Sequence, residues 1–97
     1  MTYRNTETDD FFRAVLSLEN VDECYRFFED VCTVKEILDI AQRLQVARML
    51  YDKKSYTEIG EATGMSTATI SRVNRCLTYG SGGYPMIIER LFAEKKQ

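Results

Sequence analysis

The sequence predicts an all-α protein built from six helices. Apolar residues recur at spacings of three and four along almost the whole chain, and no segment alternates apolar and polar residues as a half-buried strand does. At three places a Ser, Thr or Asn is followed three residues later by Glu, which is typical of a helix start. The 97 residues, numbered 1–97, fit a single domain.

The first two predicted helices carry more apolar surface than a small domain readily buries. The first begins at about Asp9 or Asp10, and the second follows the N-cap Asn20, with Glu23 three positions on. Their stripes are Phe11, Phe12, Val15, Leu16 and Leu18, then Cys24, Tyr25, Phe27, Phe28, Val31 and Cys32. Because small domains bury a smaller share of their surface, we expect these helices to pair with a second copy of the chain. Packing into a monomeric bundle is the alternative.

The third predicted helix runs over 34–51 and follows a capping box formed by Thr33 and Glu36. It is apolar on two sides, so it should have neighbours on both. One stripe is Val34, Ile37, Leu38, Ala41, Leu44 and Tyr51, and the other is Ile40, Ala47 and Leu50. Residues 9–51 are therefore predicted to be the dimerisation helices.

Residues 55–78 predict a helix-turn-helix. Ser55 and Glu58 form a capping box, and Gly64 ends that helix with the positive φ that a tight turn needs. Ser66 or Thr67 caps the next helix, which continues to about Thr78. The structural positions are Ile59, Gly60, Gly64, Met65, Ile70 and Val73, with Ala62 as a further apolar contact and Gly60 as the small residue where the helices approach.

The other side of the fifth helix has the composition of a DNA-recognition surface. The predicted DNA-binding residues are Ser66, Thr67, Ala68, Ser71, Arg72, Arg75, Lys53 and Lys54. Small side chains near a helix N-terminus let the backbone enter the major groove, ~12 Å wide, while Arg binds guanine or phosphate. The first helical N–H groups suit a phosphate oxygen. A solvated helix face is the alternative.

The sixth predicted helix covers 84–95, with Pro85 in its first turn. The preceding Gly80-Ser81-Gly82-Gly83 is interpreted as a helix stop and hinge, since it lacks the Gly-Lys-Ser/Thr ending of a phosphate-binding loop.

The inventory of reactive residues argues against an enzyme. The chain has no His, its carboxylates are scattered, and its three cysteines (Cys24, Cys32 and Cys76) form neither a C-x-x-C pair nor an even disulfide set. We therefore expect no metal, no cofactor and buried, reduced thiols in a cytoplasmic, nucleoid-associated protein. No uncharged apolar run is long enough to span a membrane.

Charge is distributed unevenly along the chain. The net charge is −2, but residues 1–40 sum to −6 and residues 41–97 to +4. Such asymmetry favours a polyanion as the partner of the second half, although a solvated acidic face explains the first half equally well.

The segments ECYRFFED, AQRL, STATISRVNRCL and YGSGGY resemble the Trp-repressor-related YerC/YecD group of bacteria. Ala68-Thr69-Ile70-Ser71-Arg72 resembles the DNA-reading segment of the Trp repressor itself. The resemblance implies a TrpR-like fold, an intertwined homodimer with two helix-turn-helix units, and transcriptional repression at a double-stranded operator.

The tryptophan site of that family does not carry over. Arg72 matches the arginine that stacks on the corepressor, but Val73 stands where the family has the glycine that leaves room for the indole. Cys76 stands at a serine position, and the second clamping arginine falls at Gln42, with Arg43 beside it. We therefore expect that tryptophan is not the effector. If the helix pair does not bind DNA, it is expected to bind another protein.

Overall fold

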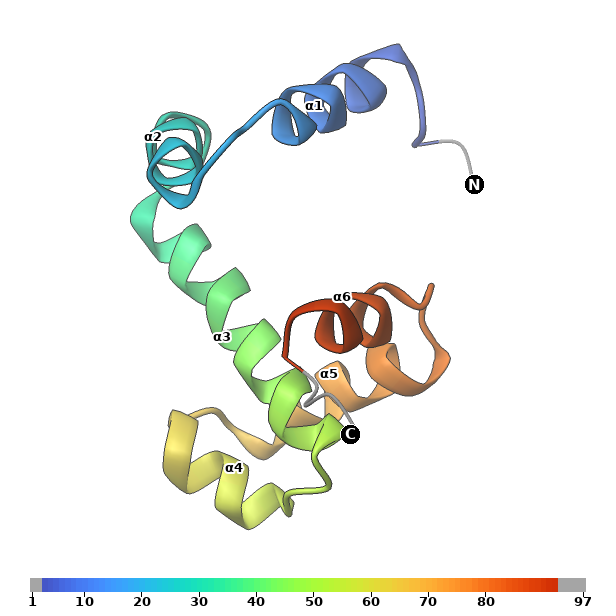
Figure 1. Ribbon diagram of the computed structural model, residues 1–97. Helices are drawn as coiled ribbons and strands as arrows, with labels where there is room; N and C mark the ends of the chain where they lie inside the picture. Colours follow the sequence, from blue (N-terminus) through green and yellow to red (C-terminus); the bar gives the residue numbers. More distant parts are fainter. Residues whose placement is uncertain (1–2, 93–97) are drawn as a thin grey trace, which may run out of the picture. The chain divides into compact units, whose positions relative to one another are not determined.

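In the computed structural model, which describes residues 3–92, the chain forms six helices and no strand. They are α1 (Thr6–Leu16), α2 (Val21–Val31), α3 (Val34–Tyr51), α4 (Tyr56–Thr63), α5 (Thr67–Tyr79) and α6 (Gly83–Leu91) (Figure 1). The all-α prediction is confirmed. None of these helices is long and apolar enough to cross a membrane.

The chain divides into two compact units, with the boundary between Ile37 and Leu38 inside α3. The first unit centres on four aromatic rings. Phe11 stacks on Phe27 at a centroid distance of 5.9 Å and meets Phe28 edge-on at 6.2 Å. No residue of α1 or α2 is fully buried, and Leu16 is 83% exposed. The aromatic rings therefore join α1 to α2 while leaving much apolar surface uncovered.

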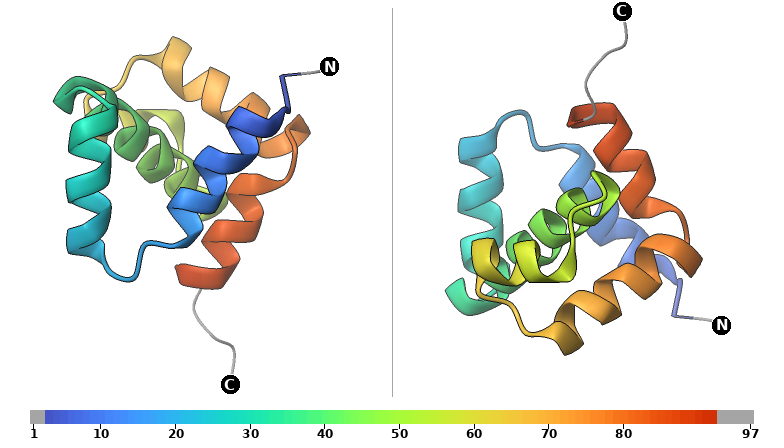
Figure 2. Two further views of the ribbon diagram at one scale, coloured as in Figure 1. Left: turned by 90° about the horizontal axis from the view of Figure 1, so that it is seen from above. Right: turned by 90° about the horizontal axis from the view of Figure 1, so that it is seen from below.

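The second unit contains the buried core of the described residues. Val46 and Ala47 of α3, Ile59 of α4, Ile70 and Val73 of α5, and Ile88 of α6 are its members. Figure 2 shows α4, α5 and α6 around the C-terminal half of α3. All four helices thus contribute to one core, and α5 lies between α4 and α6 in contact with both.

Helix starts follow the capping logic of the sequence. At α3, the Thr33 N–H donates to the Glu36 carboxylate at 2.8 Å and the Glu36 N–H donates to Thr33 Oγ1 at 3.1 Å. At α2, the Asn20 side chain accepts from the Glu23 N–H at 2.8 Å. These local bonds satisfy N–H groups that have no partner inside the helix.

The first helix begins earlier than Asp9, so that prediction is wrong. Asn5 is the N-cap, and it forms a capping box with Thr8 through bonds of 2.8 and 2.9 Å. Thr takes the place usually held by Glu or Gln, so the motif is not visible as the standard pattern. The last helix ends at Leu91, and residues 93–95 of the predicted 84–95 span lie outside the described part of the chain.

Two side-chain contacts fasten α6 to α3. The Arg48 guanidinium lies over the Phe92 ring, 3.8 Å from its centroid, and the Tyr51 hydroxyl donates to the Glu89 carboxylate. The hydrogen bond to Glu89 raises the pKa of Tyr51 above its ordinary value, because an ionised phenol beside a carboxylate is disfavoured. These contacts hold α6 at the C-terminal half of α3.

Candidate nucleic-acid interface

A tight turn joins α4 to α5. Helix α4 starts at a complete capping box, in which the Ser55 N–H donates to Glu58 at 2.8 Å and the Glu58 N–H donates to Ser55 Oγ at 3.1 Å. It ends at Gly64, whose φ of +74° is left-handed and whose N–H donates to the Gly60 carbonyl at 2.8 Å. Ser66 then caps α5 by accepting from the Thr69 N–H at 3.2 Å. The structure thus has its turn at Gly64 and its helix N-caps at Ser55 and Ser66.

The inner faces of α4 and α5 meet in the core. Ile59 is fully buried, Ile70 is 1% exposed and Val73 is 4% exposed, while Met65 of the turn is half-buried against them. Ala62 is exposed, so the structure does not bury it as the further apolar contact that the sequence predicted.

Gly60 of α4 faces the backbone of the turn. A Cβ atom there would be 3.7 Å from the Met65 carbonyl oxygen, which is an ordinary contact. A methyl group therefore fits at Gly60 without displacing a neighbour.

The outer face of α5 is exposed along its length. We use this name for Thr67, Ala68, Ser71, Arg72 and Arg75, all of them exposed, together with the exposed N-cap Ser66. Ala68, Ser71, Arg72 and Arg75 line one open hollow of about 210 Å³. Within residues 3–92, neither of these arginines pairs with a carboxylate. Both guanidinium groups are therefore available to an anionic partner.

Lys53 and Lys54 lie in the connection before α4 and are exposed. Lys53 has a φ of +69°, the one left-handed residue other than glycine among those described. Its N–H donates to the Leu50 carbonyl, and the Lys54 N–H donates to the Met49 carbonyl, both at 3.0 Å. These two hydrogen bonds satisfy carbonyl groups in the last turn of α3 and fix the backbone conformation of the two lysines.

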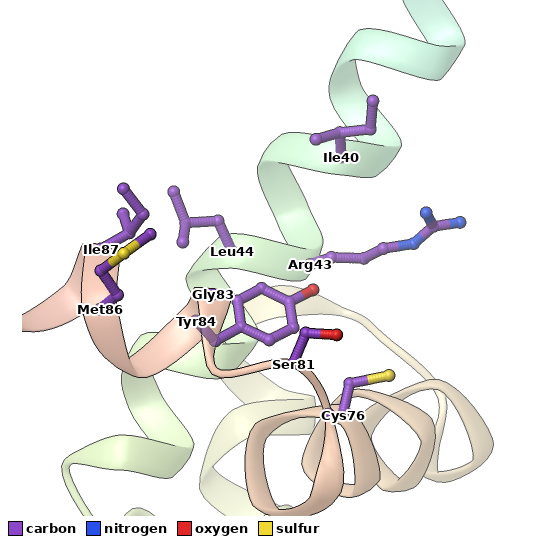
Figure 3. A pocket seen from close by; sticks show the side chains of 10 residues that line it. Ile40, Arg43, Leu44, Cys76, Ser81, Gly83, Tyr84, Met86 and Ile87 are labelled. Atoms are coloured by element: carbon purple, nitrogen blue, oxygen red, sulfur yellow. The ribbon is translucent and has the colours of Figure 1, made fainter. Parts of the chain in front are cut away.

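Another pocket of the second unit is lined by residues other than those of the outer face of α5. It measures about 660 Å³ and is mainly apolar, with Ile40, Arg43 and Leu44 from α3, Cys76 from α5, and Met86 and Ile87 from α6 (Figure 3). The ring of Tyr84 lies among them, and burial raises the pKa of Tyr84.

The residues at or beside the tryptophan-site positions of the family are divided between this pocket, the outer face of α5 and the core. Arg43 and Cys76 line the pocket, whereas Arg72 lines the hollow on the outer face of α5. Val73 is part of the buried core. The branched side chain thus fills space next to Arg72 that a glycine would leave open.

The three cysteines contradict the expectation of burial. Cys24 and Cys76 are exposed and Cys32 is half-buried, all three as free thiols. The general tendency of cysteine to be buried fails here because the core of the chain is small and is already filled by aliphatic residues. No group of three or more potential metal ligands is found among the described residues.

Comparison with known proteins decides the family. A family model described as "Trp repressor protein" matches residues 6–92. The chain belongs to this family. A Bacillus subtilis protein named "Uncharacterized protein YerC" is 53% identical over 88 residues, which cover 91% of this chain and 85% of that protein.

Solved structures of the family agree with the fold. The crystal structure of a TrpR-like protein from Eubacterium eligens is 52% identical, covers 96% of each chain and superposes with a TM-score of 0.90. A candidate Trp repressor from Staphylococcus aureus is 48% identical, with a TM-score of 0.89 over 96% of this chain and 93% of that one. The TrpR-like fold is therefore shown over nearly the whole chain.

Proposed function

We propose that this protein is a transcriptional regulator that binds double-stranded DNA through α5 and acts as a repressor by occupying an operator. The outer face of α5 is the observation that carries the proposal. It combines small residues near the helix N-terminus, where the backbone can approach the bases, with two arginines that have no carboxylate partner in the described chain. Membership of the Trp repressor family supports the same function.

Each residue of this face has a specific proposed role. The N–H groups at the start of α5, with Ser66 and Thr67, bind a phosphate. Ala68 and the methyl group of Thr67 contact a thymine methyl, while Ser71 and Arg72 contact base edges. Arg75, Lys53 and Lys54 contact the flanking phosphates.

The proposal includes a homodimer formed mainly by residues up to Tyr51. The exposed apolar side chains of α1 and α2, among them Phe12 at 58% exposure, support this because single-chain packing leaves them in water. In a two-fold dimer, two copies of α5 read half-sites about one helical turn apart on the DNA. The protein acts from the cytoplasm at the nucleoid.

We further propose that L-tryptophan is not the effector. The burial of Val73 supports this, because its side chain occupies the position that the family leaves open for the indole. Isothermal calorimetry should therefore detect no micromolar binding of L-tryptophan.

Selection of duplexes from a random DNA pool tests the function, with light scattering to measure the mass. We expect a symmetric consensus and a particle of twice the 11.3 kDa chain mass. Binding should weaken as salt increases, because phosphate contacts release counterions. An affinity that does not change with salt would contradict contacts to phosphates.

Arg72→Ala is the sharpest variant for this test. Loss of a base contact should weaken binding to the selected duplex by about 1–3 kcal/mol while the light-scattering mass stays the same. Arg90→Ala removes the same charge from an exposed position on α6 and serves as the control. Equal effects of the two variants would show that only net charge matters.

A protein-interaction module is the second candidate function. The acidic first 40 residues and the net charge of −2 favour it. A selection that enriches no duplex would favour this candidate over DNA binding.

A further inference from the structure

The turn between α4 and α5 contains a side-chain hydroxyl that bonds to the backbone on both sides. Thr63, the last residue of α4, donates from Oγ1 to the Ile59 carbonyl at 2.7 Å. The same Oγ1 accepts from the Met65 N–H at 3.2 Å. We call this arrangement the Thr63 clamp.

The Thr63 hydroxyl accepts a hydrogen bond from the Met65 N–H, a backbone group that has no partner within either helix. Met65 lies between the C-cap Gly64 and the N-cap Ser66, so its N–H belongs to neither helix. Both bonds of the clamp are partly buried. A partly buried N–H without a partner is costly, so the hydroxyl stabilises this one turn conformation.

The clamp also connects the core to the start of α5. Ile59 is fully buried, and Met65 packs against the same core. Ser66 comes directly after Met65, and its Oγ accepts from the Thr69 N–H and lies 3.1 Å from Thr69 Oγ1. Core, clamp and cap thus form one continuous set of contacts that ends at the first turn of α5.

We infer that Thr63 is a positioning residue for DNA recognition: its hydroxyl fixes the turn and thereby sets the orientation of α5. This inference rests on the proposed function. Thr63 does not belong to the outer face of α5, and its half-buried hydroxyl is already bonded on both sides. Its effect on binding is therefore expected to come through geometry.

The first test needs no DNA. In the full chain, Thr63→Val keeps the branched shape and removes the hydroxyl, whereas Thr63→Ser keeps the hydroxyl. Amide exchange at Met65, followed by NMR, should accelerate about tenfold in Thr63→Val, the factor that corresponds to 1.4 kcal/mol. It should stay close to the wild-type rate in Thr63→Ser. The Gly64 amide, which is bonded to the Gly60 carbonyl, is the internal reference for global destabilisation.

The second test measures recognition. Thr63→Val should bind the selected duplex about tenfold more weakly than the wild type, and Thr63→Ser should restore the affinity. A duplex of scrambled sequence should be bound equally by all variants, since nonspecific contacts to phosphates do not need one orientation of α5. Thr57→Val changes an exposed residue of α4 in the same way and is the matched control.

The outcomes separate the two claims. Unchanged exchange at Met65 in Thr63→Val, or unchanged affinity for the selected duplex, overturns the inference. A wild-type chain that prefers no duplex overturns the proposed function instead, and the role of Thr63 in DNA recognition falls with it. In that case the exchange measurement still decides whether the clamp fixes the turn.

Discussion

Single residues fix the helix-turn-helix through backbone conformation as much as through packing. Gly64 takes a left-handed φ of +74°, and no atom beyond its two chain neighbours lies within 4 Å of the position where its Cβ would be. Its requirement for glycine is thus conformational and not steric. Gly60 lies inside α4 and has room for a methyl group, so glycine only weakens the helix there.

Two alanine substitutions should therefore change stability in opposite directions. Gly64→Ala should lower the free energy of unfolding by about 1–2 kcal/mol, since an L-residue is strained in the left-handed region. Gly60→Ala should raise it by roughly 0.5–1 kcal/mol, because alanine has the higher helix propensity. Urea denaturation of both variants against the wild type measures the difference. A destabilised Gly60→Ala would show that the two helices approach more closely than the structure indicates.

Features that follow a rule for neighbouring residues could be predicted from the sequence, whereas two features of the backbone could not. The turn glycine, the caps at Asn20, Thr33 and Ser55, and the buried Ile70 were predictable because each follows a local rule. The Thr63 clamp was missed because the Met65 N–H comes within reach of the Thr63 hydroxyl only once the turn has formed. The left-handed Lys53 was missed because lysine carries no signal for that conformation.

At the scale of the elements, α4 is short and depends on how it begins. Its eight residues contribute one buried side chain, Ile59. The capping box of Ser55 and Glu58 therefore contributes much of the stability of its first turn. The hydrogen bonds from the Ser55 backbone and side chain hold the pKa of Glu58 below the ordinary value of 4.5.

The lowered pKa of Glu58 predicts that the folded protein loses stability at low pH. A carboxylate whose pKa is lowered by folding stabilises the fold above its unfolded pKa, and this contribution disappears as the pH falls through the folded pKa. Glu58→Gln should therefore destabilise the protein at neutral pH, and the difference from the wild type should shrink as the pH falls below about 4.5. Urea midpoints between pH 7 and pH 3 measure this difference.

Glu61→Gln removes the same charge from an exposed position on α4 and controls for general charge effects. If Glu58→Gln and Glu61→Gln gave the same pH profile, the cap would have no special role.

The bounds of a helix could be predicted where a short sequence motif marks its start or its end. The bounds of α3 and α4 agree with the sequence because capping boxes and Gly64 mark them. The start of α1 was placed too late because the Asn5–Thr8 box has an unusual composition. The exposed cysteines were mispredicted because burial depends on the packing of the whole unit and not on residue type alone.

At the scale of the whole molecule, the uneven charge and the uncovered apolar surface have one explanation in the proposed function. The basic second half contains the outer face of α5, and the apolar side chains of α1 and α2 are available to a second copy. The sequence indicated both features, but it does not give the geometry of a dimer, which depends on contacts between chains.

Backbone amide shifts measured by NMR during titration with the selected duplex show whether the outer face of α5 binds DNA. We expect the largest changes on residues 66–75, with smaller ones at Lys53 and Lys54. Changes confined to α1 and α2, with the amides of α5 unmoved, would contradict it.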